Sequence, residues 1–383
     1  MNRDLLSGEY KRFPKHWEVI PFTKAFKDMT GGQTKIPKGD YLESGDIPII
    51  DQGQDLIGGY TNERQAVCDI RLPCVVFGDH TKIFKFVTKP FALGADGVKV
   101  LSEANNIDPK FAYYFLNTLN LPDVGYSRHF RFLKRTFFPL PPLEEQRRIA
   151  AILDKADGVR RKRKEAIRLT EELLRSTFLE MFGDPVTNPK GWEICELQNV
   201  CNRVTDGTHQ PPNWADEGIP FIFVSNIVNG EIDFKVSKHI TEESWFELTS
   251  RCPIEINDIL YTTVGSYGNA ALVRTKNRFC FQRHIAHIKP DSRSIEPEFL
   301  LGMMQSDWTR QQADKQARGV AQKTLNLREL KKFTIFTPPI EEQKKYVKLR
   351  QGVEKQLSYY RSALEQSENL FNSLLQRAFR GEL

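Results

Sequence analysis

Apolar residues recur at helical spacing in two long segments without proline, residues 143–182 and 340–380. In the second segment they alternate steps of three and four residues, with Ser367 in the one gap, and are Val353, Leu357, Tyr360, Leu364, Phe371, Leu374 and Ala378. The first segment has a similar stripe of Ile167, Thr170, Leu174, Phe178 and Met181. Each segment predicts a helix of about 40 residues, roughly 60 Å long. Apolar stripes this narrow indicate that each helix packs against a partner helix, and each segment is the obvious partner of the other. The alternative is two ordinary surface helices on separate domains.

The rest of the chain has a different pattern, in which short β-branched and aromatic runs alternate with glycine and proline turns. Cys74 to Phe77 and Asp258 to Tyr261 are two such runs, and they predict strands. Phe111 to Leu119 and Pro297 to Met304 predict short helices. The globular parts of the chain should therefore mix α and β structure.

Three sequence markers occur twice in the same order, which indicates an internal duplication. The paired segments are residues 14–19 and 189–194, 107–111 and 295–299, and 141–146 and 338–343. Their offsets are 175, 188 and 197 residues, so the globular part changed length after the duplication. Each copy is a globular part that ends at a Pro-Pro pair and continues into one long helix.

Composition adds limits on the class of protein. The 383 residues are enough for two domains with connectors. A net charge of +6 is only mildly basic and does not by itself indicate a nucleic-acid partner. The six cysteines form no C-x-x-C pair, which favours free thiols in a reducing cytoplasm over a zinc or redox motif. The start of the chain has no signal-like apolar region and no stretch of 18 apolar residues occurs, so we expect a cytoplasmic protein without a membrane span.

The duplicated pattern resembles the specificity subunit of type I restriction–modification enzymes. That family has two variable domains, each followed by a P-L-P-P-L-x-E-Q boundary and a long helix. Here the boundaries read PLPPLEEQ at 139–146 and TPPIEEQ at 337–343. The second domain adds GIPFI at 218–222, GSYGN at 265–269 and RGVAQKTLN at 318–326.

The resemblance implies an α+β fold with two mixed α/β target recognition domains, separated by two long helices that form an antiparallel coiled coil. The recognition domains would be residues 1–140 and 184–337, and the spacer helices would be residues 141–183 and 338–383. Each recognition domain would read one half of a split double-stranded DNA target.

By the same resemblance, the helices would set the spacing and dock two methyltransferase subunits, which restriction/translocase subunits can join. S-adenosylmethionine, ATP and magnesium would bind those partners, and no cofactor would bind this chain. Two other interpretations stay open. One is the same architecture serving a type II enzyme whose partner fuses cutting and methylation; the other is a non-enzymatic helical scaffold with protein-binding ends.

Polar and basic loop residues are the candidates for DNA contact, because arginine suits guanine while asparagine and glutamine suit adenine. In the first domain the candidates are Lys82, Arg128, His129 and Arg131. In the second they are His209, Gln210, Tyr267, Asn269, Arg318, Gln322 and Lys323. For any one of them, the alternative is a solvated surface residue.

Motifs for catalysis are missing from the sequence. It has no Asn-Pro-Pro-Tyr or Asp-Pro-Pro-Tyr motif for methyl transfer and no G-x-x-x-x-G-K-[ST] phosphate loop. Cys280, His284 and His287 could suggest a metal site, but without a nearby fourth ligand we favour core or surface histidines. We therefore expect a non-catalytic protein without a metal site.

Two charged features have plainer explanations than a functional site. The five basic residues at 160–164 cover every side of a helix, so we favour a solvated or salt-bridged run over a docking or phosphate-facing one. The Glu-Glu-Gln triplets at 144–146 and 341–343 follow Pro-Pro at a helix start, where acids complement the helix dipole.

Overall fold

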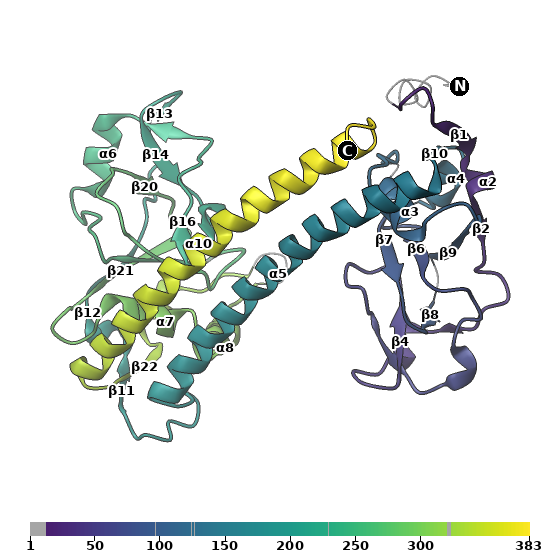
Figure 1. Ribbon diagram of the computed structural model, residues 1–383. Helices are drawn as coiled ribbons and strands as arrows, with labels where there is room; N and C mark the ends of the chain where they lie inside the picture. Colours follow the sequence, from purple (N-terminus) through teal and green to yellow (C-terminus); the bar gives the residue numbers. More distant parts are fainter. Residues whose placement is uncertain (1–12, 96, 124, 126, 229, 320–322) are drawn as a thin grey trace. The chain divides into compact units, whose positions relative to one another are not determined.

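The computed structural model describes residues 13–95, 97–123, 125, 127–228, 230–319 and 323–383 (Figure 1). The chain divides into two compact units. Unit 1 comprises Met1–Ala166 and Tyr360–Leu383, and unit 2 comprises Ile167–Tyr359. Each unit therefore takes in part of both long helices, whereas the sequence assigns these helices to segments of their own.

Unit 1 is built on a four-stranded sheet in the order β2-β9-β6-β7. These strands are Phe26–Asp28, Val98–Glu103, Cys74–Gly78 and Phe84–Val87. A second sheet has the order β3-β8-β4-β5, with strands Lys35–Ile36, Ala92–Gly94, Ile47–Ile50 and Gly59–Thr61. Strands β1 (Glu18–Pro21) and β10 (Phe137–Leu140) pair antiparallel, and the short helices are α2 (Phe22–Ala25), α3 (Pro109–Leu116) and α4 (Phe130–Leu133).

Unit 2 repeats this plan. Its main sheet has the order β12-β21-β18-β19, with strands Cys201–Asp206, Ile285–Pro290, Ile259–Thr262 and Ala270–Leu272. The second sheet, β13-β17-β14-β20, contains Trp214–Ala215, His239–Ile240, Ile219–Ile222 and Cys280–Phe281. Smaller pairs join β11 (Glu193–Glu196) to β22 (Thr334–Thr337) and β15 (Ile227–Val228) to β16 (Glu231–Ile232). The short α-helices of this unit are α6 (Glu242–Thr249), α7 (Pro297–Met304), α8 (Asp307–Gln316) and α9 (Leu327–Lys331).

The strand order of the two main sheets confirms the duplication predicted from the sequence. In each sheet the first strand lies beside the last, and the two middle strands follow. The predicted strands are present as β6 and β18, and the predicted helix at 297–304 is α7. Helix α3 begins two residues before the expected Phe111, because the Asp108 carboxylate accepts the backbone N–H groups of Lys110 and Phe111 at 3.0 Å. It ends at Leu116 rather than Leu119.

The long helices are α5 (Leu143–Phe182) and α10 (Ile340–Ala378). In unit 1 the first part of α5, with Ile149 and Leu153, packs in one core with Phe371 near the end of α10. In unit 2 the end of α5, with Phe178, packs in one core with Tyr346 near the start of α10. The two helices thus pair antiparallel within each unit, and the predicted fold class is confirmed.

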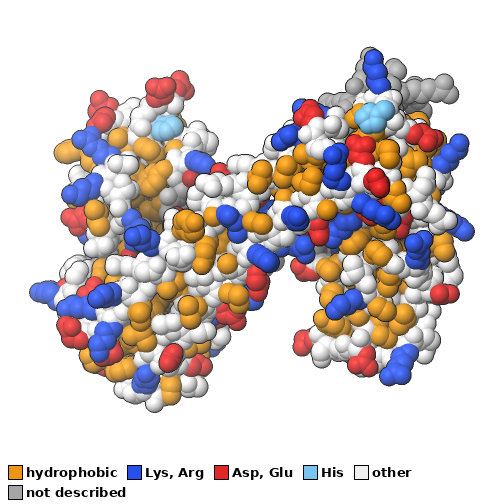
Figure 2. Space-filling view, in the orientation of Figure 1, with side chains coloured by type: hydrophobic (Ala, Val, Ile, Leu, Met, Phe, Trp, Pro, Cys, Tyr) orange, Lys and Arg blue, Asp and Glu red, His pale blue; other side chains and the backbone are white. Residues whose placement is uncertain are grey.

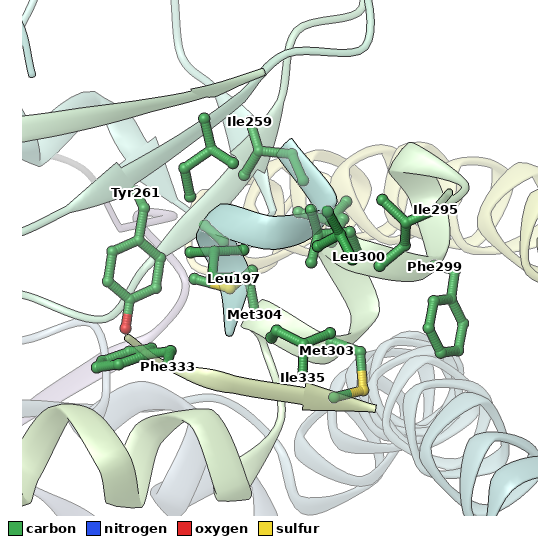
Figure 3. Packing of buried hydrophobic residues seen from close by; sticks show 14 of the residues in the cluster. Leu197, Ile259, Tyr261, Ile295, Phe299, Leu300, Met303, Met304, Phe333 and Ile335 are labelled. Atoms are coloured by element: carbon green, nitrogen blue, oxygen red, sulfur yellow. The ribbon is translucent and has the colours of Figure 1, made fainter. Parts of the chain in front are cut away.

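Each unit has its own apolar core, which includes side chains from the long helices. In unit 2, the α7 side chains Phe299 and Met303 lie in the same cluster as Phe333 and Ile335 (Figure 3). Phe178 of α5 stacks near Phe299, with ring centroids 5.9 Å apart. Because each unit buries apolar faces of both helices, neither helix is a mere connector.

A buried glutamine ties the start of each long helix to the globular part before it. Gln146 and Gln343 are both 0% exposed. Gln343 Oε1 accepts the Glu296 N–H at 2.8 Å, and its Nε2 donates to the Pro338 carbonyl at 2.8 Å. Gln146 makes the same two bonds in unit 1: its Oε1 accepts the Asp108 N–H, and its Nε2 donates to the Pro141 carbonyl. The last residue of the Glu-Glu-Gln triplet is therefore a structural clamp, a role that helix initiation alone did not predict.

The basic run at 160–164 is salt-bridged, as favoured from the sequence. Arg160 contacts Asp157 at 2.5 Å and its guanidinium lies 4.4 Å from the centre of the Phe371 ring. Arg161 also contacts Asp157, at 3.0 Å, and Lys164 contacts Glu368 of α10 at 3.0 Å. Three of the five basic side chains therefore form ion pairs within unit 1.

We predict that Gln343→Met destabilises the protein although the new side chain has a similar length. The Glu296 N–H and the Pro338 carbonyl would stay buried without a partner, at a cost of about 1–3 kcal/mol for such a group. Urea unfolding of the variant measures the loss. Gln351→Met is the matched control on an exposed position of α10, and it should change the free energy of unfolding by less than about 0.5 kcal/mol. Equal effects of the two substitutions would contradict the clamp.

Candidate nucleic-acid interface

One end of the main sheet of unit 2 collects most of the candidate residues of the second domain. In the strand register, Asp206 at the end of β12 lies opposite Ala286, and Thr262 at the end of β18 lies opposite Ile285. The loop after β12, the β18–β19 turn and the turn before β21 therefore emerge together. We call this end of the sheet the unit 2 edge.

The loop after β12 presents His209 and Gln210, both of which are exposed. His209 Nε2 lies 2.7 Å from the Asp206 carboxylate. The Thr208 hydroxyl donates to the Gln210 carbonyl and accepts the Gln210 N–H. A bridge between Thr208 and Gln282 places this loop beside the turn before β21. The two candidates are therefore held on a loop that is anchored to the sheet.

The β18–β19 turn presents Asn269 on a rigid backbone. Thr262, which is 0% exposed, accepts the Asn269 N–H on its hydroxyl at 2.9 Å and donates that hydroxyl to the Ser266 carbonyl at 2.7 Å. Gly265 and Gly268 both have φ in the left-handed region, at +70° and +90°, which such a tight turn requires. The exposed Asn269 amide is thus fixed in place before any ligand arrives.

The segment that carries Arg318 and Lys323 is joined to the same turn. Arg318 and Thr324 exchange backbone hydrogen bonds at 2.9 and 2.8 Å, and the Lys323 carbonyl accepts the Gly265 N–H at 3.1 Å. Both basic side chains are exposed. The structure therefore brings Arg318, Lys323 and Asn269 to one edge, while Gln322 lies outside the described residues.

Tyr267 differs from the other candidates because its side chain is only 5% exposed. Its hydroxyl donates to Asp314 of α8 at 2.5 Å, and the Arg310 guanidinium lies 4.7 Å from the ring centre. Arg310 also donates to the Tyr267 carbonyl at 2.6 Å. The ring therefore joins the β18–β19 turn to α8 and offers little exposed surface, and its contact with DNA stays a prediction.

Arg283 and His284 belong to the unit 2 edge, although sequence reasoning did not nominate them for DNA contact. They form the turn before β21, and the His284 carbonyl accepts both the N–H and the hydroxyl of Thr263, at 2.9 and 3.0 Å. Burial, followed by the charge of Arg283, lowers the pKa of His284. The sequence signal for this turn is a basic pair between two strand-like runs.

The same end of the unit 1 sheet holds the candidates of the first domain. Gly78, at the end of β6, lies opposite Val98, at the start of β9. Lys82 follows in the next turn with a φ of +63°, and its ammonium lies 3.6 Å from Asp123. Lys82 is half-buried, and the Asp123 carboxylate partly balances its charge.

Asp79 holds the basic closing loop of unit 1 against this turn. The side chain is 2% exposed and accepts the Phe130 N–H at 2.6 Å, while its carbonyl accepts the His129 N–H at 2.8 Å. His129 Nδ1 also lies 3.0 Å from that carbonyl, and the imidazole is 1% exposed. His129 therefore supports the loop from inside unit 1, and its direct contact with DNA stays a prediction.

Arg128 and Arg131 remain exposed on the same loop. Arg131 donates to the Ser127 hydroxyl at 3.2 Å and lies 4.8 Å from the centre of the Phe132 ring. Nearby, Lys99 pairs with Asp28 at 2.9 Å. This end of the unit 1 sheet, which we call the unit 1 edge, thus offers arginine groups where the unit 2 edge offers arginine, amide and imidazole groups.

Side chains of both charges occur together on the visible face of the molecule (Figure 2). On the face drawn in Figure 2, Lys and Arg side chains are interspersed with Asp and Glu side chains. What distinguishes the two edges is the combination of exposed polar side chains and anchored loops.

The described residues contain neither a metal-binding cluster nor a helix that could span a membrane. No group of three or more histidine, cysteine, aspartate or glutamate side chains in those ranges is arranged to hold a metal ion. In the same ranges, none of the helices combines the length and the apolar character needed to cross a membrane. His287 does not join Cys280 and His284 in a cluster, since its ring contacts Cys252 and Asp258 instead.

Comparison with known proteins agrees with this architecture. The type I restriction enzyme EcoBI specificity subunit of Escherichia coli is 28% identical over 336 residues, which cover 77% of this chain and 70% of that protein. The EcoR124I/EcoR124II specificity subunit of Escherichia coli is 24% identical over 364 residues, 87% of this chain and 85% of that protein. The solved type I restriction–modification S subunit from M. genitalium shares the fold, with a TM-score of 0.57, 16% identity and coverage of 95% of this chain and 96% of that one.

The chain matches one family model twice, in agreement with its internal duplication. The model of the type I restriction modification DNA specificity domain matches residues 14–169 and again residues 189–359. Each match begins with a globular part and runs on into one of the long helices. With two copies spanning most of its length, the chain belongs to the type I restriction modification DNA specificity domain family.

Proposed function

We propose that this chain is the specificity subunit of a type I restriction–modification complex and that its two units read the two halves of a split double-stranded DNA target. The observation that carries the proposal is the repeated edge. Two sheets of the same strand order present anchored polar loops at the same end, within a chain that matches a DNA specificity domain twice.

The chemistry of the unit 2 edge suits sequence reading. Arginine can donate two bonds to guanine O6 and N7, which fits Arg283 and Arg318, while a side-chain amide suits the N6 and N7 edge of adenine, which fits Asn269 and Gln210. Lys323 suits a phosphate, where it would position the protein without specifying a base. Because the loops are already fixed by backbone bonds, little ordering cost opposes such contacts.

In unit 1 we assign Arg128 and Arg131 to direct DNA contact and Lys82 to phosphate contact. Lys82 would exchange its bond to Asp123 for a phosphate oxygen, a small change because the distance between these groups is 3.6 Å and Asp123 is 82% exposed. His129 and Asp79 would act through the backbone of the loop.

We assign the long helices to docking of two methyltransferase subunits, which restriction/translocase subunits join in a cutting complex. Large apolar side chains are exposed along both helices, and docked partners would remove their surface from water. On α5 they include Val159, Leu169, Leu173 and Leu179, and on α10 they include Leu349, Tyr359 and Leu370. S-adenosylmethionine, ATP and magnesium would bind these cytoplasmic partners, and this chain would supply recognition without catalysis.

The purified chain alone should not transfer a methyl group to DNA. The reason is that the sequence has no amino-methyltransferase motif, so the chemistry must come from a partner. Transfer of label from S-adenosylmethionine to DNA measures it, with the chain plus its methyltransferase partner as the positive control. Methyl transfer by the chain free of partners would show that the division of roles is wrong.

Exchange of residues 187–337 for the equivalent domain of a relative should change one half of the methylated motif and leave the other intact. Each unit has its own sheet, core and edge, so each should read its half-site independently. Sequencing that detects methylated bases reports both halves. A motif that changes in both halves, or in neither, would be incompatible with separate reading.

Arg283→Ala and Arg318→Ala should each weaken binding of the assembled methyltransferase complex to its target by about 1–3 kcal/mol, if each contacts a base. Arg293→Ala is the matched control. Arg293 is exposed beyond the opposite end of β21, where it pairs with Asp291, and its loss should leave affinity unchanged.

Binding titrations on target and on unrelated DNA separate the contact types. A base contact loses affinity mainly for the target, whereas a phosphate contact loses it equally for both sequences. If neither variant differs from the Arg293 control on either DNA, the unit 2 edge is not the interface.

A further inference from the structure

Unit 2 contains a cysteine–histidine–aspartate constellation that DNA reading does not use. Cys252 Sγ lies 3.4 Å from His287 Nδ1, and His287 Nε2 lies 2.6 Å from the Asp258 carboxylate. This is the arrangement of an activated nucleophile, in which a thiol contacts a base and a third group orients that base. The cysteine is partly exposed, while His287 and Asp258 are 1% and 4% exposed.

The fold holds the two supporting groups firmly. His287 is in the middle of β21, opposite Thr205 on one side and Leu260 on the other. Asp258 immediately precedes β18, where its carboxylate accepts the Glu255 N–H at 2.8 Å and its carbonyl accepts the Val273 N–H at 2.8 Å. The imidazole is therefore fixed with one ring nitrogen toward a carboxylate and the other toward the thiol.

Cys252 comes from a different part of the unit. It follows α6, and its N–H donates to the Thr249 carbonyl at 3.1 Å. The charged groups around the constellation are of both signs. Lys289, which follows His287 on β21, contacts Asp258 at 2.9 Å and Glu255 at 2.8 Å, and Arg203 of β12 donates to the Arg251 carbonyl at 2.7 Å.

These surroundings favour an ion pair between the thiol and the imidazole. Burial opposes charge on both groups, raising the thiol pKa and lowering the imidazole pKa. For Cys252 the hydrogen bond and charge of His287, then Arg203 and Lys289, outweigh burial and lower its pKa. For His287 the bonds to Asp258 and Cys252 outweigh burial and raise its pKa.

Among the described residues of the unit, the other partly exposed cysteines, Cys195 and Cys201, have no histidine partner of this kind. Burial, followed by the charge of Glu193, raises the pKa of Cys195. Burial is also the main cause that raises the pKa of Cys201 to about 12. Neither thiol should ionise near neutral pH, so both provide internal references on the same molecule.

We infer that Cys252 is a covalent modification site, at which a thiolate held by His287 and Asp258 attacks small neutral electrophiles. Limited exposure restricts the size of the reagent, and the mixed charges nearby favour a neutral one. With iodoacetamide the thiolate sulfur forms a bond to the methylene carbon, and iodide leaves with the electron pair of the carbon–iodine bond. No proton is transferred in that step, and His287 keeps its proton.

The test compares alkylation of the native chain with that of the same chain unfolded in urea. Both are treated briefly with iodoacetamide at pH 6, and alkylation of each cysteine is measured by peptide mass spectrometry. Each unit of lowered pKa increases the thiolate fraction tenfold and reduces its intrinsic reactivity only about threefold, so activation raises the net rate. Native Cys252 should therefore react faster than unfolded Cys252, while native Cys195 should react more slowly than unfolded Cys195.

This comparison separates activation from exposure, because simple exposure cannot make a folded thiol faster than the unfolded one. A native rate for Cys252 at or below its unfolded rate at pH 6 would overturn the inference. So would a rate that rises with pH in parallel with that of Cys195.

Asp258→Asn tests the role of the carboxylate. Without a negative partner the imidazolium is less favoured, and the rate of Cys252 at pH 6 should fall at least to its unfolded value. Cys195→Ser is the matched control and should leave the Cys252 rate unchanged. Circular dichroism verifies the fold of each variant; if Asp258→Asn does not fold, the comparison on the unaltered chain decides.

Discussion

The buried glutamine at the start of each long helix determines how the rest of the molecule can be arranged. Gln146 and Gln343 each satisfy a backbone N–H at the start of a short helix and a backbone carbonyl just before the long one. A glutamine without these partners would leave polar groups buried and unpaired, at a cost of about 1–3 kcal/mol for each. The direction in which each long helix leaves its globular part is therefore coupled to the position of α3 or α7.

Both long helices, α5 and α10, contribute side chains to the core of unit 1 and to the core of unit 2. Phe178 from the end of α5 packs with Tyr346 from the start of α10 in unit 2, while Phe371 near the end of α10 belongs to the core of unit 1. Each unit is thus completed by a helix that begins in the other copy of the duplicated sequence. A duplication retained for two-part DNA reading explains why both copies keep the Pro-Pro boundary and the following glutamine while their loops differ.

The loops at the two edges show how similar scaffolds can present different chemistry. In unit 2 a buried threonine, Thr262, fixes the turn that carries Asn269, whereas in unit 1 a buried aspartate, Asp79, fixes the loop that carries Arg131. Loops anchored by buried side chains can change their outward residues without loss of the core. Cys252 and His287 lie on the same scaffold but belong to no such loop, so we assign their chemistry separately.

The sequence by itself determined the duplication, the long paired helices and the fold class, because periodicity and repeated markers are local properties of the chain. It also identified the loops that carry Asn269 and Arg318. Only the tertiary structure decided which side chains face outward: Tyr267 and His129 are buried by elements distant in sequence, and Arg283 reaches the edge through strand pairing. Side-chain exposure and the meeting of distant groups depend on how strands register and helices pack, and no local pattern encodes either.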